Sequence, residues 1–310
     1  MKTFVDFGLI ALMKFSLVIL TILSLPAVGL AQSGLRADLF EPAPSIGDLL
    51  ATRSAEIKKG RFTISLGSDW AYHVLGIENP DKSATKWIVE QRASLQASFN
   101  YAPSSQLRLA AGFNSAVFQQ GTRSNDWGAE VPLEAAMGST WLAAVWAPLR
   151  SSDGRLAGAL ETSLVLPSAQ TSGLVGARDL GVRVTGLFSA RFDWISLLLN
   201  LGMATRSQIE FRDLDRDDGL IYRLGVEFGH NTWPVFISAE LAGETPLHNP
   251  FSSGLNEFLE TLWGVRAKFG DFHLQLGASI GLLGAGAPKV RGLALVRWTI
   301  TSEKMGACIE

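Results

Sequence analysis

Cysteine, net charge and charged residues are all scarce in this sequence, and each shortage excludes a class of protein. The single cysteine, Cys308, excludes a disulfide framework and any metal site built from several cysteines of one chain. A formal net charge of −2 excludes a nucleic-acid binder that depends on a basic surface. Charged residues form only 18% of the chain, whereas soluble domains usually have about 25%. This low share is expected where much of the surface faces lipid.

Long apolar runs are absent after the first 31 residues, so no second membrane helix is predicted. Within those residues, Lys14 precedes an apolar run over 15–25, and proline and small residues follow up to Ala31. This pattern is typical of a secretory signal peptide cleaved between Ala31 and Gln32. A transmembrane anchor is the alternative, but the run is short for a span of about 20 residues. Met13 is an alternative start, since Lys14 follows it directly.

From residue 61 onward, apolar and polar residues alternate with a period of two. A tilted membrane strand needs about 9–11 residues, and soluble strands usually have about 5–6. We therefore predict an all-β protein, a transmembrane antiparallel up-and-down β-barrel of about 12 strands over residues 61–300. The alternating runs cover residues 62–73, 89–101, 106–118, 140–149, 155–167, 178–189, 194–205, 219–229, 234–244, 257–269, 272–282 and 289–300.

The connections between these runs alternate in length. A soluble sandwich also alternates in polarity, but short periplasmic turns and long outer loops are typical of outer-membrane barrels, which satisfy all backbone groups in lipid. An even strand number places both barrel ends of the chain in the periplasm. Short turns are predicted near 102–105, 150–154, 190–193, 230–233 and 270–271, and longer loops near 74–86, 119–139, 168–177, 206–218 and 245–256.

Two polar segments flank the predicted barrel. Residues 32–60 are interpreted as a periplasmic lead-in, with a short helix considered near 46–58. Residues 301–310 are interpreted as a periplasmic tail. The predicted organisation is therefore signal peptide 1–31, lead-in 32–60, barrel 61–300 and tail 301–310.

Parity divides the strand residues into two faces. Rings on the lipid face are expected to form aromatic girdles at the two interfaces. Lipid-facing candidates include Trp70, Phe99, Tyr101, Trp146, Phe188, Phe228, Trp263 and Trp298, together with Leu95, Leu199 and Leu276. Lumen-facing charged candidates are Asp69, Glu90, Arg92, Arg108, Glu161, Arg183, Arg223, Glu227, Glu240, Glu260, Arg266, Lys268, Arg291 and Arg297.

A lumen with both signs of charge allows two arrangements. It forms either a narrow hydrophilic pore or a network of ion pairs that closes the barrel. Small inward residues, such as Gly67, Gly112, Gly202 and Gly277, leave room and favour the pore slightly. No ring of one charge sign is evident, so ion selectivity is not predicted.

The last strands contain a recognisable pattern. Residues 257–266 contain Glu260 and end in Gly-x-Arg, and a Gly-rich strand over 274–282 and a Gly-x-Gly-x-Pro loop over 284–288 follow. This pattern resembles the closing strands of the amino-terminal barrels of OmpA-like outer-membrane proteins. The resemblance covers roughly residues 60–300 and implies a transporter-like barrel. Longer members carry a peptidoglycan-binding domain after the barrel, but only residues 301–310 follow here, so that domain is not implied.

Catalytic, cofactor and metal sites are not predicted. His73 and Asp69 share a strand face but are separated by roughly 13 Å, too far to pair directly, and no phospholipase-like or Gly-x-Ser-x-Gly motif is present. The acidic loop from Asp213 to Asp218 invites a calcium interpretation. However, Asp218 stands where the calcium-binding loop needs glycine, and Leu224 where it needs glutamate. A solvated outer loop is the preferred interpretation, and its role stays open.

The predicted function is a passive channel or transporter-like pore for small solutes in the outer membrane of a Gram-negative cell. A non-conducting structural or surface-contact barrel is the alternative, and a membrane-embedded hydrolase is the third hypothesis. Expected partners are outer-membrane lipid, the barrel-assembly machinery and small solutes, with no nucleic acid. The transported solute, the gating and the oligomeric state are not encoded in any motif we recognise.

Overall fold

A computed structural model describes residues 40–45, 47–78, 85–121, 135–169, 176, 179–206, 209–211, 214–230, 232–251, 257–284 and 287–301. The chain divides into two units, residues 1–32 and 33–310, and all described residues belong to the second. The predicted signal peptide, its cleavage pair Ala31 and Gln32, and the tail after residue 301 lie outside the described residues. Among those described, no helix is long and apolar enough to cross a membrane.

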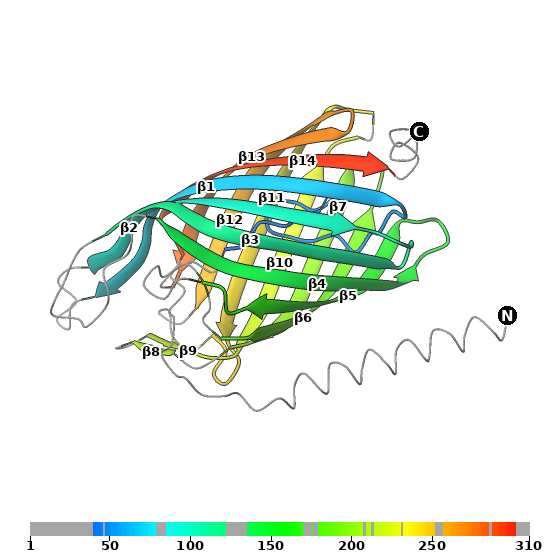
Figure 1. The fold of residues 1–310 in the computed structure, drawn as a ribbon. Coiled ribbons are helices and arrows are strands. Elements are labelled where there is room, and N and C mark those ends of the chain that lie inside the picture. Colours follow the sequence, from blue (N-terminus) through cyan, green and yellow to red (C-terminus); the bar gives the residue numbers. More distant parts are fainter. Residues whose placement is uncertain are drawn as a thin grey trace. The chain divides into compact units, whose positions relative to one another are not determined.

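Twelve antiparallel strands form a closed barrel, which confirms the predicted fold class. Each wall strand pairs with the next wall strand along the chain, with β10 following β7, and β14 closes the barrel by pairing with β1 (Figure 1). The wall consists of β1 (Arg61–Glu78), β2 (Thr85–Tyr101), β3 (Leu107–Gln120), β4 (Ala136–Arg150), β5 (Leu156–Leu166), β6 (Gly181–Arg191), β7 (Ile195–Thr205), β10 (Gly219–Phe228), β11 (Val235–Pro246), β12 (Phe258–Phe269), β13 (Phe272–Leu283) and β14 (Val290–Thr301).

The two ends of the barrel differ in their connections, as the sequence predicts. Short turns join β2 to β3, β4 to β5, β6 to β7, β10 to β11 and β12 to β13 at one end, here called the turn end. Longer connections lie at the opposite, loop end. One of them contains a separate two-stranded hairpin, β8 (Ile209–Phe211) with β9 (Leu214–Arg216), which the sequence did not predict.

The first hairpin departs from the prediction of a long loop over 74–86. Its strands stay paired to Glu78 and again from Thr85, but the register shifts between Tyr72 and Leu75. His73 lies in this irregularity with a positive φ of 56°. A bulge of this kind inserts a residue and reverses the parity of the strand beyond it, which is why the alternation in the sequence ends near residue 73 while the pairing continues.

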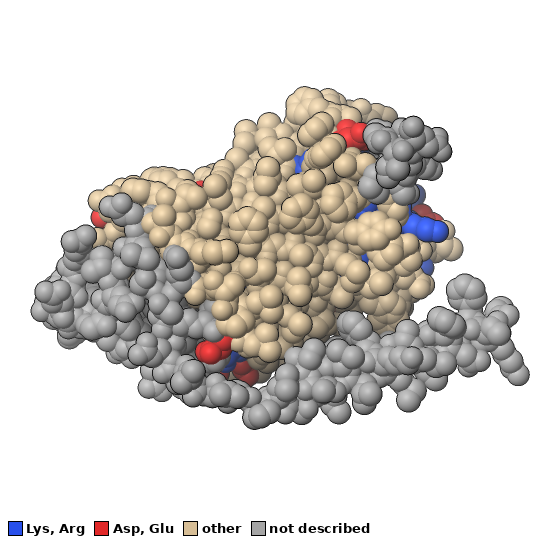
Figure 2. All heavy atoms as spheres, viewed as in Figure 1, with Lys and Arg blue, Asp and Glu red and all other residues tan. Residues whose placement is uncertain are grey.

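The outer surface of the wall is apolar. The lipid-facing candidates Leu95 and Leu276 are 48% and 52% exposed, and Trp146 and Trp263 lie on the same outer face. Figure 2 shows a broad uncharged area on the visible wall, with charged side chains mainly at its margins. An apolar surface this large is stable against lipid rather than water, so the wall has the surface of a membrane barrel.

Residues 40–45 and 47–58 lie inside the barrel, and we call them the lumen segment. Leu49, Leu50 and Ala55 of this segment are completely buried, although they belong to no strand of the wall. Figure 1 shows the segment in blue among the strands. The predicted periplasmic lead-in is therefore wrong for these residues, and the helix considered there is absent from the described ones. A polar segment is equally stable in bulk water and in a polar lumen, so composition could not show whether these residues lie in the periplasm or inside the barrel.

Candidate functional site

The lumen segment is fixed to the wall by hydrogen bonds that use its backbone. The Glu240 carboxylate of β11 accepts the backbone N–H groups of Leu50, Ala51 and Thr52 at 2.7, 2.9 and 2.7 Å. Since a segment without strand partners must satisfy its buried N–H groups elsewhere, one inward glutamate takes the place of a neighbouring strand. Arg223 of β10 donates to the carbonyl oxygen of Ala51 at 2.7 Å from the same side.

A second anchor lies on β14 and β7. Arg297 donates to the carbonyl oxygens of Ala43 and Leu49 at 2.8 and 2.9 Å, and to Gln275 of β13 at 2.7 Å. On the opposite wall, Asn200 accepts the N–H of Arg53 at 2.7 Å and donates to its carbonyl oxygen at 2.8 Å. The segment is thus attached to strands from both sides of the barrel.

The segment also has internal structure. The Asp48 carboxylate accepts the backbone N–H groups of Ser45 and Ser54, both at 2.7 Å. The N–H of Ala43 donates to the carbonyl oxygen of Leu50 at 2.8 Å. These bonds fold the segment into a compact turn instead of an extended thread.

Charges of the lumen segment neutralise charges of the wall. Arg53 pairs with Glu161 of β5, and Glu41 pairs with Arg183 of β6. Nearer the turn end, Glu56 pairs with Arg191 at 2.7 Å. In a water-poor lumen, an unpaired charge is costly, so these contacts bind the segment to the wall electrostatically.

Other inward charges pair within the wall itself. Arg291 donates to Asp69 at 2.8 Å and to Glu260 at 3.0 Å, and its guanidinium lies 4.4 Å from the centre of the Phe40 ring. Arg266 pairs with Glu227 at 2.7 Å. The wall therefore contains the ion-pair network that the sequence offered as one of two arrangements.

Glycines of the wall make room for the lumen segment. A Cβ atom on Gly225 would lie 2.5 Å from Leu49 Cδ1 and 3.1 Å from Thr52 Oγ1, and one on Gly277 would overlap Leu50. The small inward residues favoured an open pore in the sequence. That inference is wrong for Gly277, because the space beside it is filled by Leu50.

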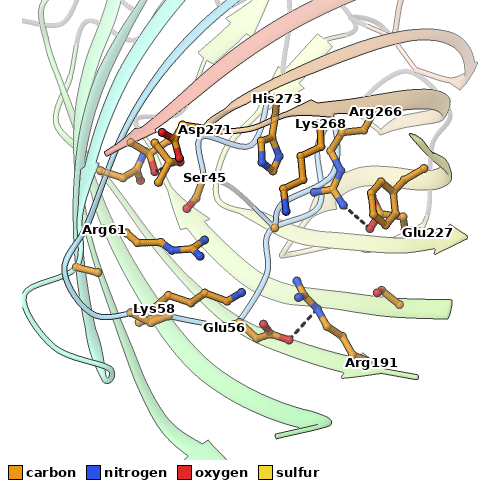
Figure 3. A pocket seen from close by; sticks show the side chains of 18 of the residues that line it. Ser45, Glu56, Lys58, Arg61, Arg191, Glu227, Arg266, Lys268, Asp271 and His273 are labelled. Atoms are coloured by element: carbon orange, nitrogen blue, oxygen red, sulfur yellow. Dashed lines mark hydrogen bonds and ion pairs between the residues drawn. The ribbon is translucent and has the colours of Figure 1, made fainter. Parts of the chain in front are cut away.

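A cavity of about 330 Å³ remains at the turn end, between the lumen segment and the wall. Figure 3 shows Lys58, Arg61, Lys268 and His273 pointing toward this space, with the Glu56–Arg191 and Arg266–Glu227 pairs at its edge. Its other polar lining residues include Ser45, Thr63, Asn100, Arg108 and Asp271. Within the described part of the chain, the lumen is thus hollow at the turn end, and the buried side chains of the lumen segment occupy the space beside it.

The structure places most charged lumen candidates in the interior. Glu90 is partly buried in β2, and Lys268 is exposed where it lines the turn-end cavity. Arg183 and Arg223 are partly buried and contact the lumen segment. Buried candidates are Asp69, Arg92, Arg108, Glu161, Glu227, Glu240, Glu260, Arg266, Arg291 and Arg297.

Sequence reasoning missed two groups of interior residues. The first is the set of charges on the lumen segment, namely Glu41, Asp48, Arg53 and Glu56. A usable signal existed for them, since the inward cations outnumber the inward acids in the strands and need further carboxylates. The second is the set of neutral polar residues at inward parity, Asn200, Gln119 and Gln275, all buried.

The histidines and acidic residues form no reactive cluster in the described part of the chain. His73 stacks against Tyr72 at 3.8 Å and against Trp87 at 4.0 Å between ring centres. No group of three or more His, Cys, Asp or Glu residues that could hold a metal is found among the residues described. Asp213 of the acidic loop lies outside them.

Fold and lumen together define the class: a 12-strand barrel with a lipid-facing wall and a charged interior, as in outer-membrane barrels. The chain is similar to the COG4313 outer membrane channel from Pseudomonas putida F1, at 12% identity and a TM-score of 0.58, over 84% of this chain and 100% of that one. It is also similar to the KdgM porin in complex with disordered oligogalacturonate, at 10% identity and a TM-score of 0.45, over 76% and 98%. No protein-family model and no curated protein matches it.

Proposed function

We propose that this protein is a passive channel for small solutes in the outer membrane, and that the lumen segment closes it in the structure described here. The main observation behind this proposal is that the barrel interior is polar and charged, and that it is occupied by the lumen segment, which is not one of the wall strands. In a barrel of about eight strands, inward side chains of the wall are sufficient to fill the interior, whereas the interior of a 12-strand barrel is wider. A separate segment leaves a way to open the lumen without breaking the wall.

The contacts that hold the segment are of a kind that water can replace. Each neutral hydrogen bond contributes a net of about 0.5–1.5 kcal/mol, and those to charged groups about 1.5–3 kcal/mol. When the segment leaves, Glu240, Arg297 and Asn200 become available to water in a hydrophilic lumen. The wall, by contrast, cannot open in lipid, because its backbone groups would lose their partners.

The location and orientation rest on the same features. The apolar wall supports a membrane, and the similarity to a protein described as an outer membrane channel supports the outer membrane. Short turns at one end and long connections at the other support a turn end facing the periplasm. Cleavage after Ala31 and assembly by the barrel-assembly machinery belong to this proposal. The narrower resemblance to OmpA-like barrels stays a prediction.

Conductance tests the proposal directly. The purified full chain, reconstituted in planar bilayers, is expected to show discrete conductance steps separated by closed periods. If no steps occur at any voltage, in protein whose heat-dependent gel mobility shows a folded barrel, the channel is rejected. The non-conducting structural barrel then becomes the better explanation. The number of bonds that fix the lumen segment is the observation that favours this alternative.

A hydrolase is the third candidate, and no observation favours it. His273 lines the turn-end cavity together with Ser45 and Asp271, but no hydrogen bond from its ring to a serine or a carboxylate is found among the described residues. Lipid or ester hydrolysis by the purified protein that disappears in His273→Ala would reverse this ranking.

A further inference from the structure

The turn-end cavity has an excess of positive charge. Six cationic side chains line it, Lys58, Arg61, Arg108, Arg191, Arg266 and Lys268, against four carboxylates, Glu56, Asp193, Glu227 and Asp271. Only two of the cations have ion pairs there, Arg191 with Glu56 and Arg266 with Glu227. Four cations of this cavity therefore lack a carboxylate partner in the described part of the chain.

Arg108 is the most deeply buried of these cations without a carboxylate partner. Its side chain lines the cavity although the residue is only 4% exposed, and its Nε has no hydrogen-bond acceptor among the described residues. A guanidinium is charged at every physiological pH, and an unmatched buried donor of this kind costs free energy. A buried cation facing a hollow space is an arrangement that a bound anion would complete.

The other unpaired cations approach from different elements. Lys58 belongs to the lumen segment, Arg61 begins β1 and Lys268 lies near the end of β12, and all three point toward one space in Figure 3. Lys58 remains exposed at the rim of the cavity. Partial loss of hydration there lowers the pKa of its ammonium group, Arg61, Arg191 and Lys268 lower it further, and Glu56 raises it. Neighbouring cations thus raise the free energy of charged Lys58, and an anion among them would relieve this repulsion.

We propose that the turn-end cavity binds a small oxyanion carrying two or more negative charges, of the dicarboxylate or phosphate kind. Arg108 and Arg61 offer planar N–H donors that match such oxygens in pairs, and Lys58 and Lys268 add point charges around them. Ser45 of the lumen segment and Thr63 of β1 add hydroxyl groups to the lining of the same cavity. This inference rests on the proposed channel and makes the cavity its solute-binding mouth at the turn end.

Isothermal titration of the full chain in a neutral detergent tests the site, with inorganic phosphate and malonate as probes. We expect saturable binding that weakens as the sodium chloride concentration rises. Arg108→Gln and Lys58→Gln should each weaken it by about tenfold or more, since each removes a charged donor. Arg155→Gln is the matched control, because Arg155 lies exposed in a turn at the same end and outside the cavity.

Saturable binding of either probe, lost in the cavity variants and kept in the control, supports the site. Binding of neither probe, or equal affinities in Lys58→Gln, Arg155→Gln and the parent chain, overturns it. Lys58 is exposed, so Lys58→Gln is expected to fold. This variant therefore still tests the site if Arg108→Gln does not fold. Because titration needs no conduction, binding without conductance rejects only the channel, and conductance without binding rejects only the anion site.

Discussion

At the scale of single residues, a few inward side chains do the work that a neighbouring strand does elsewhere. Glu240 accepts three consecutive N–H groups of the lumen segment, and Asp48 closes the turn within it. Outward residues have the opposite requirement, since they must carry no charge. Alternate positions of one strand therefore face two different environments, lipid on the outside and the polar lumen on the inside.

Replacing Glu240 by alanine should destabilise the protein. Three buried N–H groups lose their acceptor, so we expect the free energy of unfolding to fall by about 2 kcal/mol or more. Urea unfolding followed by tryptophan fluorescence measures the change. Asp153→Asn, in an exposed turn, is the control and should change stability much less, because its contacts are exposed to water. Equal stabilities of the two variants would show that Glu240 does not hold the segment.

Leu276 tests the outer face in the same way. It lies near the middle of β13 and is 52% exposed. Leu276→Arg should cost about 2–4 kcal/mol when the barrel refolds into lipid vesicles, because a charge then faces the hydrocarbon core. Leu276→Ala should cost clearly less. If both variants refold with the same stability, this position does not face lipid.

At the scale of elements, the lumen segment and the wall are fitted to each other. Gly225 of β10 leaves the space that Leu49 and Thr52 occupy, and Gly264 of β12 has Leu50 and Ser238 as its nearest neighbours. A Cβ atom at such a position would press on the segment and not on the lipid. Glycine at these positions is therefore needed because the lumen segment occupies the space beside it.

Gly225→Ala should lower the free energy of unfolding by about 1–3 kcal/mol through overpacking. In a chain that already carries Leu49→Ala, the same glycine substitution should cost less, since the new methyl group lies nearest Leu49. A double-mutant cycle measures the coupling. The control is Gly292→Ala, where nothing lies within 4 Å of the added carbon. Additive effects of the first two substitutions would contradict the fit.

At the scale of the whole molecule, the parity of the strands, their length and the alternating lengths of their connections together predicted the barrel. Every wall strand overlaps a run of alternating residues, because one face needs lipid and the other a polar interior. The position of residues 40–58 could not be predicted in this way, since a segment without a regular partner leaves no periodic pattern. The anchors Asn200 and Gln275 were visible as polar residues at inward parity, but nothing in the sequence names what they bind.

The central claim is that the lumen segment obstructs the channel and must move to open it. The hydroxyl oxygens of Ser54 and Ser189 lie 3.3 Å apart, so cysteines at these positions place their sulfur atoms close together, and a disulfide between them would lock the segment to β6. The test uses Ser54→Cys with Ser189→Cys, in a chain where Cys308 is replaced by serine. The chain with Ser54→Cys alone is the control.

Single-channel conductance of this protein, oxidised and then reduced in the same planar bilayer, measures the effect of the lock. The oxidised protein should show almost no open steps, and reduction should restore them, while the control should not respond to either treatment. Equal conductance in the oxidised and reduced states, with the disulfide verified by mass spectrometry, would show that solutes pass a stationary segment and would contradict the claim.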